Sequence, residues 1–149
     1  MFKLSTRSMG RLEGINPDLI RVVTEAIKNT KVDFGVTCGM RTVEEQEKLV
    51  ASGASQTMKS KHLEGRAVDL VAYAGSNVTW QLNMYDDIAD AMANAACDLG
   101  VPLKWGAAWT VGDMGDYVGT MEEAMNEYID LRRSQGRRPF IDAPHFEMM

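Results

Sequence analysis

Three helix-start signals divide this chain into short elements, and no other feature of the sequence constrains its fold as strongly. Asn16-Pro17 places a capping residue before a proline at the first helical position. Thr42 and Thr120 each begin a capping box, because a glutamate follows three residues later. The caps and the apolar spacing behind them predict helices ending near residues 29, 51 and 133, with further helices at 4–12 and 85–99.

Short strand patterns lie between these helices. Apolar runs of strand length occur at 32–37, 66–73, 101–105 and 144–147. Helices and strands do not follow the regular rhythm of parallel strand–helix–strand units. We therefore predict an α+β fold in which helices pack on a small antiparallel sheet. The chain has 149 residues, the length of one domain, and we expect a single domain over 1–149.

Composition excludes several classes of protein. The chain is 45% apolar and 25% charged, which is typical of a globular domain. Its net charge of −5 disfavours nucleic acid as a partner. No run approaches the ~20 apolar residues of a membrane span, and no apolar run of signal-peptide length follows the first basic residues. We expect synthesis in the cytoplasm. We also expect reduced thiols at Cys38 and Cys97, since two cysteines are too few for a disulfide framework.

The two histidines are the scarcest chemical groups in the chain. His62 and His145 lie 83 residues apart, and Asp69 follows the first by seven residues. Two imidazoles and a carboxylate can bind a catalytic zinc ion, which keeps three protein ligands and an open fourth position. Such a site would tie the C-terminus to the middle of the chain. Asp142, three residues before His145, is placed to take a proton from an attacking water and return it to a leaving amine.

Each histidine also has a simpler interpretation, as a structural hydrogen-bond partner of a nearby acid. From spacing alone, the metal site and the structural hydrogen bonds remain open alternatives. A structural zinc held by both histidines and both cysteines is disfavoured, because Cys38 and Cys97 lie 59 residues apart and lack the close pairing of such ligands.

A longer pattern surrounds these residues. The sequence Ser-x-His-x-x-Gly-x-Ala-x-Asp is formed by Ser60, His62, Gly65, Ala67 and Asp69, and Asp-x-x-His follows at 142–145. This combination resembles the signature of the LAS-type zinc peptidases. That family includes D-Ala-D-Ala carboxypeptidases and dipeptidases, and the phage L-alanyl-D-glutamate endopeptidases that serve as endolysins. The segments at 103–109 and 39–42 resemble two further parts of the family, so the resemblance runs from about residue 32 to 146.

The resemblance implies a hedgehog/DD-peptidase-like zinc peptidase domain with one zinc ion per chain. Its metal ligands would be His62, Asp69 and His145, with Asp142 as the general base and then acid. Arg41 would polarise the scissile carbonyl or hold a substrate carboxylate, although a solvated arginine at a helix start is the alternative. Contacts with substrate are expected from Ser60, Trp105 and Trp109. The alternatives are that Ser60 only fixes its loop and that the tryptophans belong to the core.

Two departures from the family pattern concern the segment after Trp105. Phage relatives tend to read Trp-Gly-Gly-Asp-Trp, where this chain has Ala107 and Ala108. Residues 110–141 are expected to be an insertion, either a lid beside the cleft or a surface elaboration. The arginines at its end are expected to form a solvated face or to contact an anionic cell envelope; they are Arg132, Arg133, Arg137 and Arg138.

The expected function is zinc-dependent hydrolysis of the L-alanyl-D-glutamate bond in bacterial peptidoglycan, as in phage endolysins. The alternatives are a D-Ala-D-Ala carboxypeptidase or dipeptidase, a zinc-containing module that binds wall peptides without cutting them, and a structural phage protein. We expect a monomer without a separate wall-binding domain. It would stay in the host cytoplasm until a separate membrane-permeabilising protein releases it to the wall.

Overall fold

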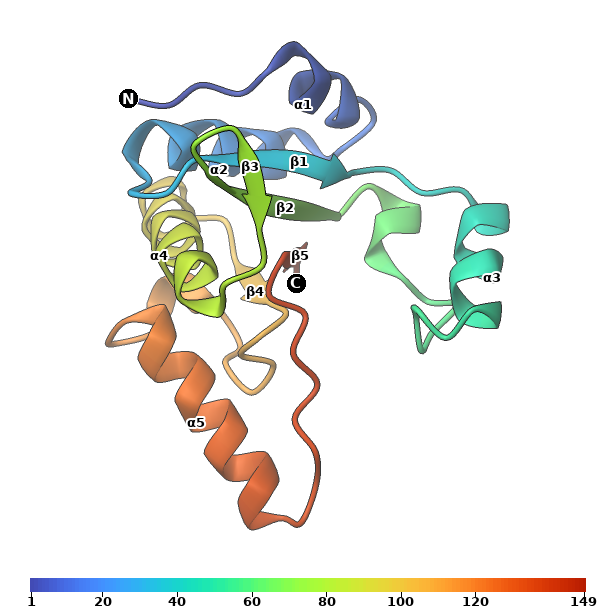
Figure 1. Ribbon diagram of the computed structural model, residues 1–149, viewed down its shortest axis with the longest axis vertical. Helices are drawn as coiled ribbons and strands as arrows, with labels where there is room; N and C mark the ends of the chain where they lie inside the picture. Colours follow the sequence, from blue (N-terminus) through green and yellow to red (C-terminus); the bar gives the residue numbers. More distant parts are fainter.

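Figure 1 shows a computed structural model that describes all residues of the chain, 1–149. Its helices are α1 (Thr6–Arg11), α2 (Pro17–Asn29), α3 (Val43–Ala51), α4 (Leu82–Leu99) and α5 (Met121–Ser134), with short 3-10 helices η1 (Lys61–Glu64) and η2 (Met114–Asp116). Its strands are β1 (Phe34–Cys38), β2 (Ala67–Ala74), β3 (Asn77–Thr79), β4 (Leu103–Trp105) and β5 (His145–Met148). None of the helices is long and apolar enough to cross a membrane.

The strands form one antiparallel sheet with the order β1-β2-β5-β4, and β3 pairs with β2 beyond this path. The predicted α+β fold with a small antiparallel sheet is therefore confirmed. The C-terminal strand β5 lies between β2 and β4, so the end of the chain is held inside the sheet. This placement brings residues near 145 beside residues near 69.

The two faces of the sheet have different surroundings. Side chains alternate along a strand, so Val68 and Leu70 on β2 point to the opposite face from Asp69. Val68 and Leu70 join Phe146 of β5 in a core that includes the buried residues of α2 and α4. The face of Asp69 carries polar groups instead. Burial of one face thus fixes the strand register, and the register fixes which polar side chains gather on the other.

The helix caps act where the sequence predicts them. Asn16, Thr42 and Thr120 each accept a hydrogen bond from the first turn of the helix they precede, and both threonine capping boxes are complete. Gly100 ends α4 in the left-handed conformation, at φ 67°. Helix α4 begins at Leu82, three residues before the predicted start. The sequence did not indicate this start, because the residue before the helix makes no capping hydrogen bond with its side chain. Strand β3 was not predicted, since its three residues are too short for an alternating pattern.

A β-bulge interrupts the pairing of β1 with β2. Val36 pairs with Leu70, but Cys38 pairs with Asp69, so one extra residue of β1 lies between these two pairs. The bulge turns Cys38 from the core face of the sheet to the face of Asp69. Bulges commonly re-aim side chains beside functional sites. This one also directs the chain that follows, with Gly39 and Arg41, towards the polar face.

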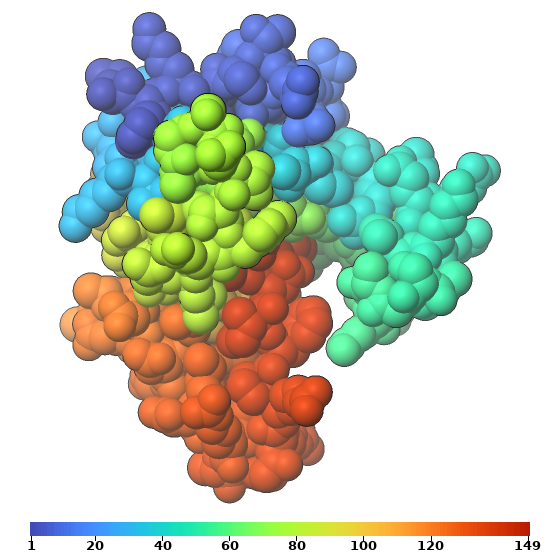
Figure 2. All heavy atoms as spheres, viewed as in Figure 1, coloured from blue at the N-terminus to red at the C-terminus, as the bar shows by residue number.

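The segment from 110 to 141 builds a lobe on α4. Helix α5 packs through buried Met121, Ala124 and Met125, and the backbone N–H of Met121 donates to Asp90 of α4 at 2.8 Å. The chain then turns at Gly136 (φ 68°) and returns to β5. In Figures 1 and 2 this helix and the return segment after it project at the end of the molecule opposite the N-terminus.

Candidate metal centre and active-site cleft

The sheet register places Asp69 and His145 directly opposite each other on β2 and β5. Nδ1 of His145 lies 3.2 Å from Oδ1 of Asp69. Both residues stand on the polar face of the sheet, although 76 residues separate them in the chain. The contact is therefore a direct product of the antiparallel pairing, in which opposite residues are cross-strand neighbours.

His62 reaches the same carboxylate from the loop before β2. Ser60 caps η1 by accepting the backbone N–H of His62, and Gly65 ends the turn at φ 69°, a conformation that favours glycine. Nδ1 of His62 donates to the carbonyl oxygen of Gly39 at 2.8 Å, which fixes the tautomer in the neutral ring and leaves Nε2 with its lone pair. That nitrogen faces Oδ1 of Asp69 at 3.3 Å but has no aligned hydrogen-bond partner, although it is buried.

Two of the three ligand-atom separations match those around a zinc ion. A tetrahedral ion with ligand bonds of ~2.0–2.1 Å separates its ligand atoms by about 3.3 Å. The distances from Asp69 Oδ1 to His145 Nδ1 and to His62 Nε2 are 3.2 and 3.3 Å. The unpartnered nitrogen of His62 and an N₂O donor set are further features of such a site. The protein thus brings together the three residues predicted as metal ligands.

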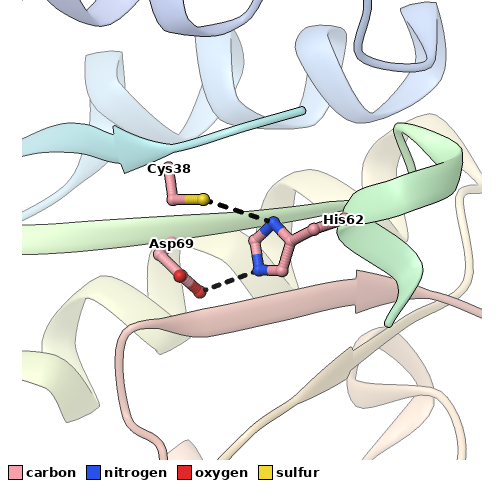
Figure 3. Close-up of side chains that lie close together, drawn as sticks. All are labelled: Cys38, His62 and Asp69. Atoms are coloured by element: carbon pink, nitrogen blue, oxygen red, sulfur yellow. Dashed lines mark hydrogen bonds and ion pairs between the residues drawn. The ribbon is translucent and has the colours of Figure 1, made fainter. Parts of the chain in front are cut away.

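Cys38 is the competing ligand. Cys38, His62 and Asp69 each offer a ligand atom within 4.8 Å of the others. Figure 3 shows, however, that the Cys38 sulfur approaches Nδ1 of His62, at 3.8 Å, whereas Asp69 approaches Nε2 on the other side of the ring. One ion cannot bind both nitrogens of one imidazole, and Nδ1 already donates to Gly39. For an ion at Nε2, Nδ1 of His145 is therefore a better-placed candidate third ligand than the Cys38 sulfur, because it faces the same carboxylate oxygen of Asp69.

Glu147 supports His145 from the next position on the same face of β5. The Nε2–H of His145 donates to Oε1 of Glu147 at 2.9 Å, so Nδ1 is the nitrogen left for a metal. Nζ of Lys61 lies 3.6 Å from the other oxygen of Glu147. Sequence reasoning missed this residue, although its two-residue spacing from His145 in a predicted strand was the available signal.

The charges of the metal-free site are strongly coupled. Burial opposes a charged imidazole, but the close contacts with the Asp69 carboxylate and with Cys38 outweigh it and raise the pKa of His62 to about 10. Burial also opposes a charged imidazole at His145. Hydrogen bonds to Asp69 and Glu147 outweigh it and raise the pKa of His145 to about 9. Burial works against the ionised Asp69, yet both imidazoles hold the pKa of that carboxyl well below its usual range. In the metal-free centre the Asp69 carboxylate thus favours the protonated form of both imidazoles.

Asp142 is held beside this centre by a turn built on Gly106. The N–H of Asp142 donates to the carbonyl of Gly106, and the N–H of Gly106 donates to the carbonyl of His145, both at 2.8 Å. A Cβ at Gly106 would meet the carbonyl oxygen of Asp142 at 2.2 Å, so the approach requires glycine. Burial, followed by the nearby Asp69 carboxylate, raises the pKa of Asp142. A raised pKa suits a carboxyl that must both accept and donate a proton.

Arg41 also borders the centre, and its side chain is only 12% exposed. One terminal nitrogen lies 3.7 Å from Oδ2 of Asp69 and 3.3 Å from the Cys38 sulfur, and the other donates to Gln46 at 2.7 Å. Gln46 is completely buried and donates in turn to Ser55 and to the carbonyl of Thr57. Gln46 of α3 thereby links the arginine to the loop that forms one wall of the cleft.

A cleft of about 640 Å³ opens over these groups. Its lining includes the three candidate ligands with Asp142, Arg41, Ser60 and Trp109. Trp109 stacks on Phe140 with ring centroids 6.4 Å apart, and its ring lies 5.7 Å from that of His145. Sequence reasoning missed Phe140, because a single aromatic residue in the polar return segment gave no periodic signal. Its presence shows that the 110–141 segment contributes to the cleft wall.

One of the predicted substrate contacts, Trp105, lies differently from expectation. Trp105 does not line the cleft: it is 1% exposed, stacks on Phe146, and donates its indole N–H to the carbonyl of Ala143 at 2.7 Å. The alternation of β4 turns its side chain towards the core, so its position does not support the substrate contact predicted for it. Ser60 does line the cleft, and its hydroxyl oxygen accepts the backbone N–H of His62.

Comparisons with known proteins agree on one family. The family model described as phage L-alanyl-D-glutamate peptidase matches residues 1–149. The L-alanyl-D-glutamate peptidase of Escherichia phage T5 is 32% identical over 120 residues, covering 78% of this chain and 86% of that protein. The enzyme of the same name from Listeria phage A118 is 42% identical over 71 residues, covering 48% of this chain and 24% of that protein.

A solved structure resembles the whole chain. The crystal structure of the Serratia marcescens L-Ala D-Glu endopeptidase ChiX matches with a TM-score of 0.75 and 31% identity. The match covers 99% of this chain and 90% of that one. The similarity in fold thus extends over the 110–141 segment as well as the cleft.

Proposed function

Because the chain belongs to the phage L-alanyl-D-glutamate peptidase family, we propose that it hydrolyses the L-alanyl-D-glutamate bond of the peptidoglycan stem peptide. The observation that carries the proposal is the convergence of His62, Asp69 and His145 beside Asp142 in one cleft. The phage relatives further support a role as an endolysin in host lysis. Production in the host cytoplasm, release to the wall and action as a monomer belong to the same proposal.

We propose one zinc ion, held by Nε2 of His62, a carboxylate oxygen of Asp69 and Nδ1 of His145. The ligand-atom distances and the unpartnered buried nitrogen support this donor set. When bound, zinc acts as a Lewis acid on the scissile carbonyl and makes water more acidic. The chain's own residues then supply the proton transfers and the orientation of the substrate.

In the proposed reaction Asp142 accepts a proton from the attacking water as the new C–O bond forms at the alanyl carbonyl. The same carboxylic acid donates that proton to the amine of D-glutamate as the C–N bond breaks. Arg41 is positioned to stabilise negative charge on the carbonyl oxygen or to hold a substrate carboxylate. Trp109 and Phe140 form an aromatic wall that keeps water from one side of the peptide.

Mass spectrometry of purified peptidoglycan digested by the zinc-loaded protein tests the function. We expect free stem peptides that begin at D-glutamate, and none in a control treated with a chelator. Loss of terminal D-alanine alone would instead identify a carboxypeptidase. Zinc-loaded protein that releases no fragments from any wall preparation would identify a binding module and contradict the proposal.

The Glu147→Gln substitution should weaken zinc binding by about 10–100-fold, the usual effect of removing a carboxylate that supports a ligating histidine. Glutamine keeps the size of the side chain but loses the charge that holds the Nε2–H of His145. Competition with a chromophoric chelator measures the dissociation constant. Glu64→Gln, on the neighbouring turn, is the charge-matched control. An unchanged affinity in Glu147→Gln would show that the contact does not position the ligand.

Zinc binding should release about two protons per ion at pH 7, because both imidazoles are protonated in the metal-free site. Two histidines with an ordinary pKa of ~6.5 would together release about half a proton. Isothermal titration calorimetry in buffers of different ionisation enthalpy measures this number. The release should fall as the pH rises through 9 to 10, where the imidazoles lose their protons without metal. A value near half a proton at pH 7 would contradict the coupled site.

A further inference from the structure

The end of the α5 lobe carries an uncommon concentration of positive charge. Four arginines, Arg132, Arg133, Arg137 and Arg138, lie within seven consecutive residues at the turn between α5 and its return segment. The chain as a whole has a net charge of −5, so this cluster, called here the arginine tip, differs in sign from the average surface. In Figure 2 the lobe that carries it projects away from the body of the molecule.

The arginine tip has no acidic partner within the chain. The ion pairs of the structure involve Arg21, Lys28, Arg41, Lys61 and the two histidines, and none includes an arginine of the tip. Arg133, Arg137 and Arg138 are exposed. Four positive charges this close repel one another, so a solvated face without a partner has an electrostatic cost that an anion would relieve.

Arg132 has a different role from the other three. Its terminal nitrogen donates to the carbonyl oxygen of Arg138 at 3.3 Å, and its Nε is buried without a partner. The backbone N–H of Arg137 donates to the carbonyl of Arg132 at 2.8 Å. These bonds close the turn and hold the exposed guanidinium groups at its outer end. The tip is therefore a turn closed by hydrogen bonds rather than a frayed helix end.

The tip is continuous with the cleft. Phe140, which lines the cleft and stacks on Trp109, follows Arg138 by two residues, and its N–H donates to the hydroxyl of Tyr128 at 3.0 Å. Asp142 follows by four residues, so its Cα lies within about 14 Å of that of Arg138 at the ~3.3–3.6 Å reach of each residue. The tip therefore lies within about 14 Å of chain from Asp142, a distance that a polymer bound in the cleft can span.

We infer that the arginine tip binds carboxylates of peptidoglycan stem peptides that neighbour the one being cut. The inference rests on the proposed function, because a polymer with repeated D-glutamate residues presents carboxylates at regular intervals beside the scissile bonds. Arginine suits this partner, since its planar fork matches a carboxylate in a bidentate geometry. The tip would hold the insoluble wall while the cleft acts on one peptide of it.

A triple variant, Arg133→Gln, Arg137→Gln and Arg138→Gln, tests the inference and leaves Arg132 to close the turn. We expect about tenfold weaker co-sedimentation with purified sacculi stripped of secondary polymers, since three exposed ion pairs of roughly twofold each combine. Cleavage of a soluble stem peptide should stay within twofold of the unchanged protein. The control variant Lys3→Gln, Arg7→Gln and Lys31→Gln removes the same charge from exposed positions outside the tip and should bind sacculi normally.

Three outcomes would overturn the inference. The first is that the triple variant binds sacculi as tightly as the unchanged protein. The second is that the control variant loses sacculus binding to the same extent. The third is that the triple variant also loses cleavage of the soluble peptide, which would place the effect in the cleft. Vesicles containing phosphatidylglycerol form a second arm: binding to them that is tighter than to sacculi would assign the tip to a membrane surface instead. Failure to cut any peptide while the tip still binds sacculi would contradict the proposed function alone.

Discussion

Replacement of His145 by alanine is expected to leave the protein without stoichiometric zinc, whereas replacement of Cys38 by serine is expected to leave the ion in place. The two variants distinguish the two ligand sets that the structure allows. The Cys38 sulfur lies 3.8 Å from His62, but it faces Nδ1, which donates to Gly39. His145 presents Nδ1 to the same carboxylate oxygen that faces Nε2 of His62.

Inductively coupled plasma mass spectrometry of each protein after dialysis gives the zinc content directly. We expect about one ion per chain in the unchanged protein and in Cys38→Ser, and less than about a tenth of that in His145→Ala, because two protein ligands hold zinc far more weakly than three. Peptidoglycan cleavage by His145→Ala should fall to that of the chelated control. Circular dichroism checks that each variant is folded. Retained zinc in His145→Ala together with its loss in Cys38→Ser would reverse the assignment.

Many of the helix boundaries follow from signals in short stretches of the sequence. The caps at Asn16, Thr42 and Thr120 are side-chain properties of single positions, so they could be read without tertiary information. The family signature placed His62, Asp69 and His145 together, and the register of β2 with β5 supplies the physical reason. The roles of these residues as zinc ligands remain predictions until the metal content is measured.

The features that the sequence did not reveal depend on contacts between distant segments. The bulge that turns Cys38 towards His62 is a property of pairing between β1 and β2, not of either strand alone. Glu147 gains its role only because Lys61 and His145 flank it. Trp105 was predicted at the cleft from the resemblance of its segment to the family, but the direction of a strand side chain depends on which face the sheet buries.

The position of the α5 lobe also depends on contacts between distant segments, which the sequence does not reveal. Its capping box predicted a helix, and the structure has that helix at Met121–Ser134. Whether the segment lies over the cleft or away from it depends on packing against α4, for which the sequence offered two alternatives. The structure shows a mixed outcome: the helix packs on α4 away from the metal ligands, while the return segment brings Phe140 to the cleft.

Substitution of Asp142 by asparagine should preserve zinc and fold but lower turnover by about 100-fold or more, the range expected when a general base is lost. Asparagine has nearly the same shape, and the turn that holds residue 142 depends on backbone bonds to Gly106 and His145, which remain. The substitution therefore removes the proton acceptor without moving its surroundings. Loss of zinc in this variant would show that Asp142 supports the metal rather than the proton transfer.

The pH dependence provides the second readout for Asp142. Burial and the Asp69 carboxylate raise its pKa, and only the ionised form can accept a proton from water. Turnover by the zinc-loaded protein should therefore fall as the pH drops through the pKa that Asp142 has beside the bound ion. The residual rate of Asp142→Asn should lack this acid limb, because asparagine does not titrate. Asp142→Glu keeps a titrating carboxyl and should recover part of the rate with the limb intact. A limb that persists in the asparagine variant would assign it to another group and remove Asp142 from the mechanism.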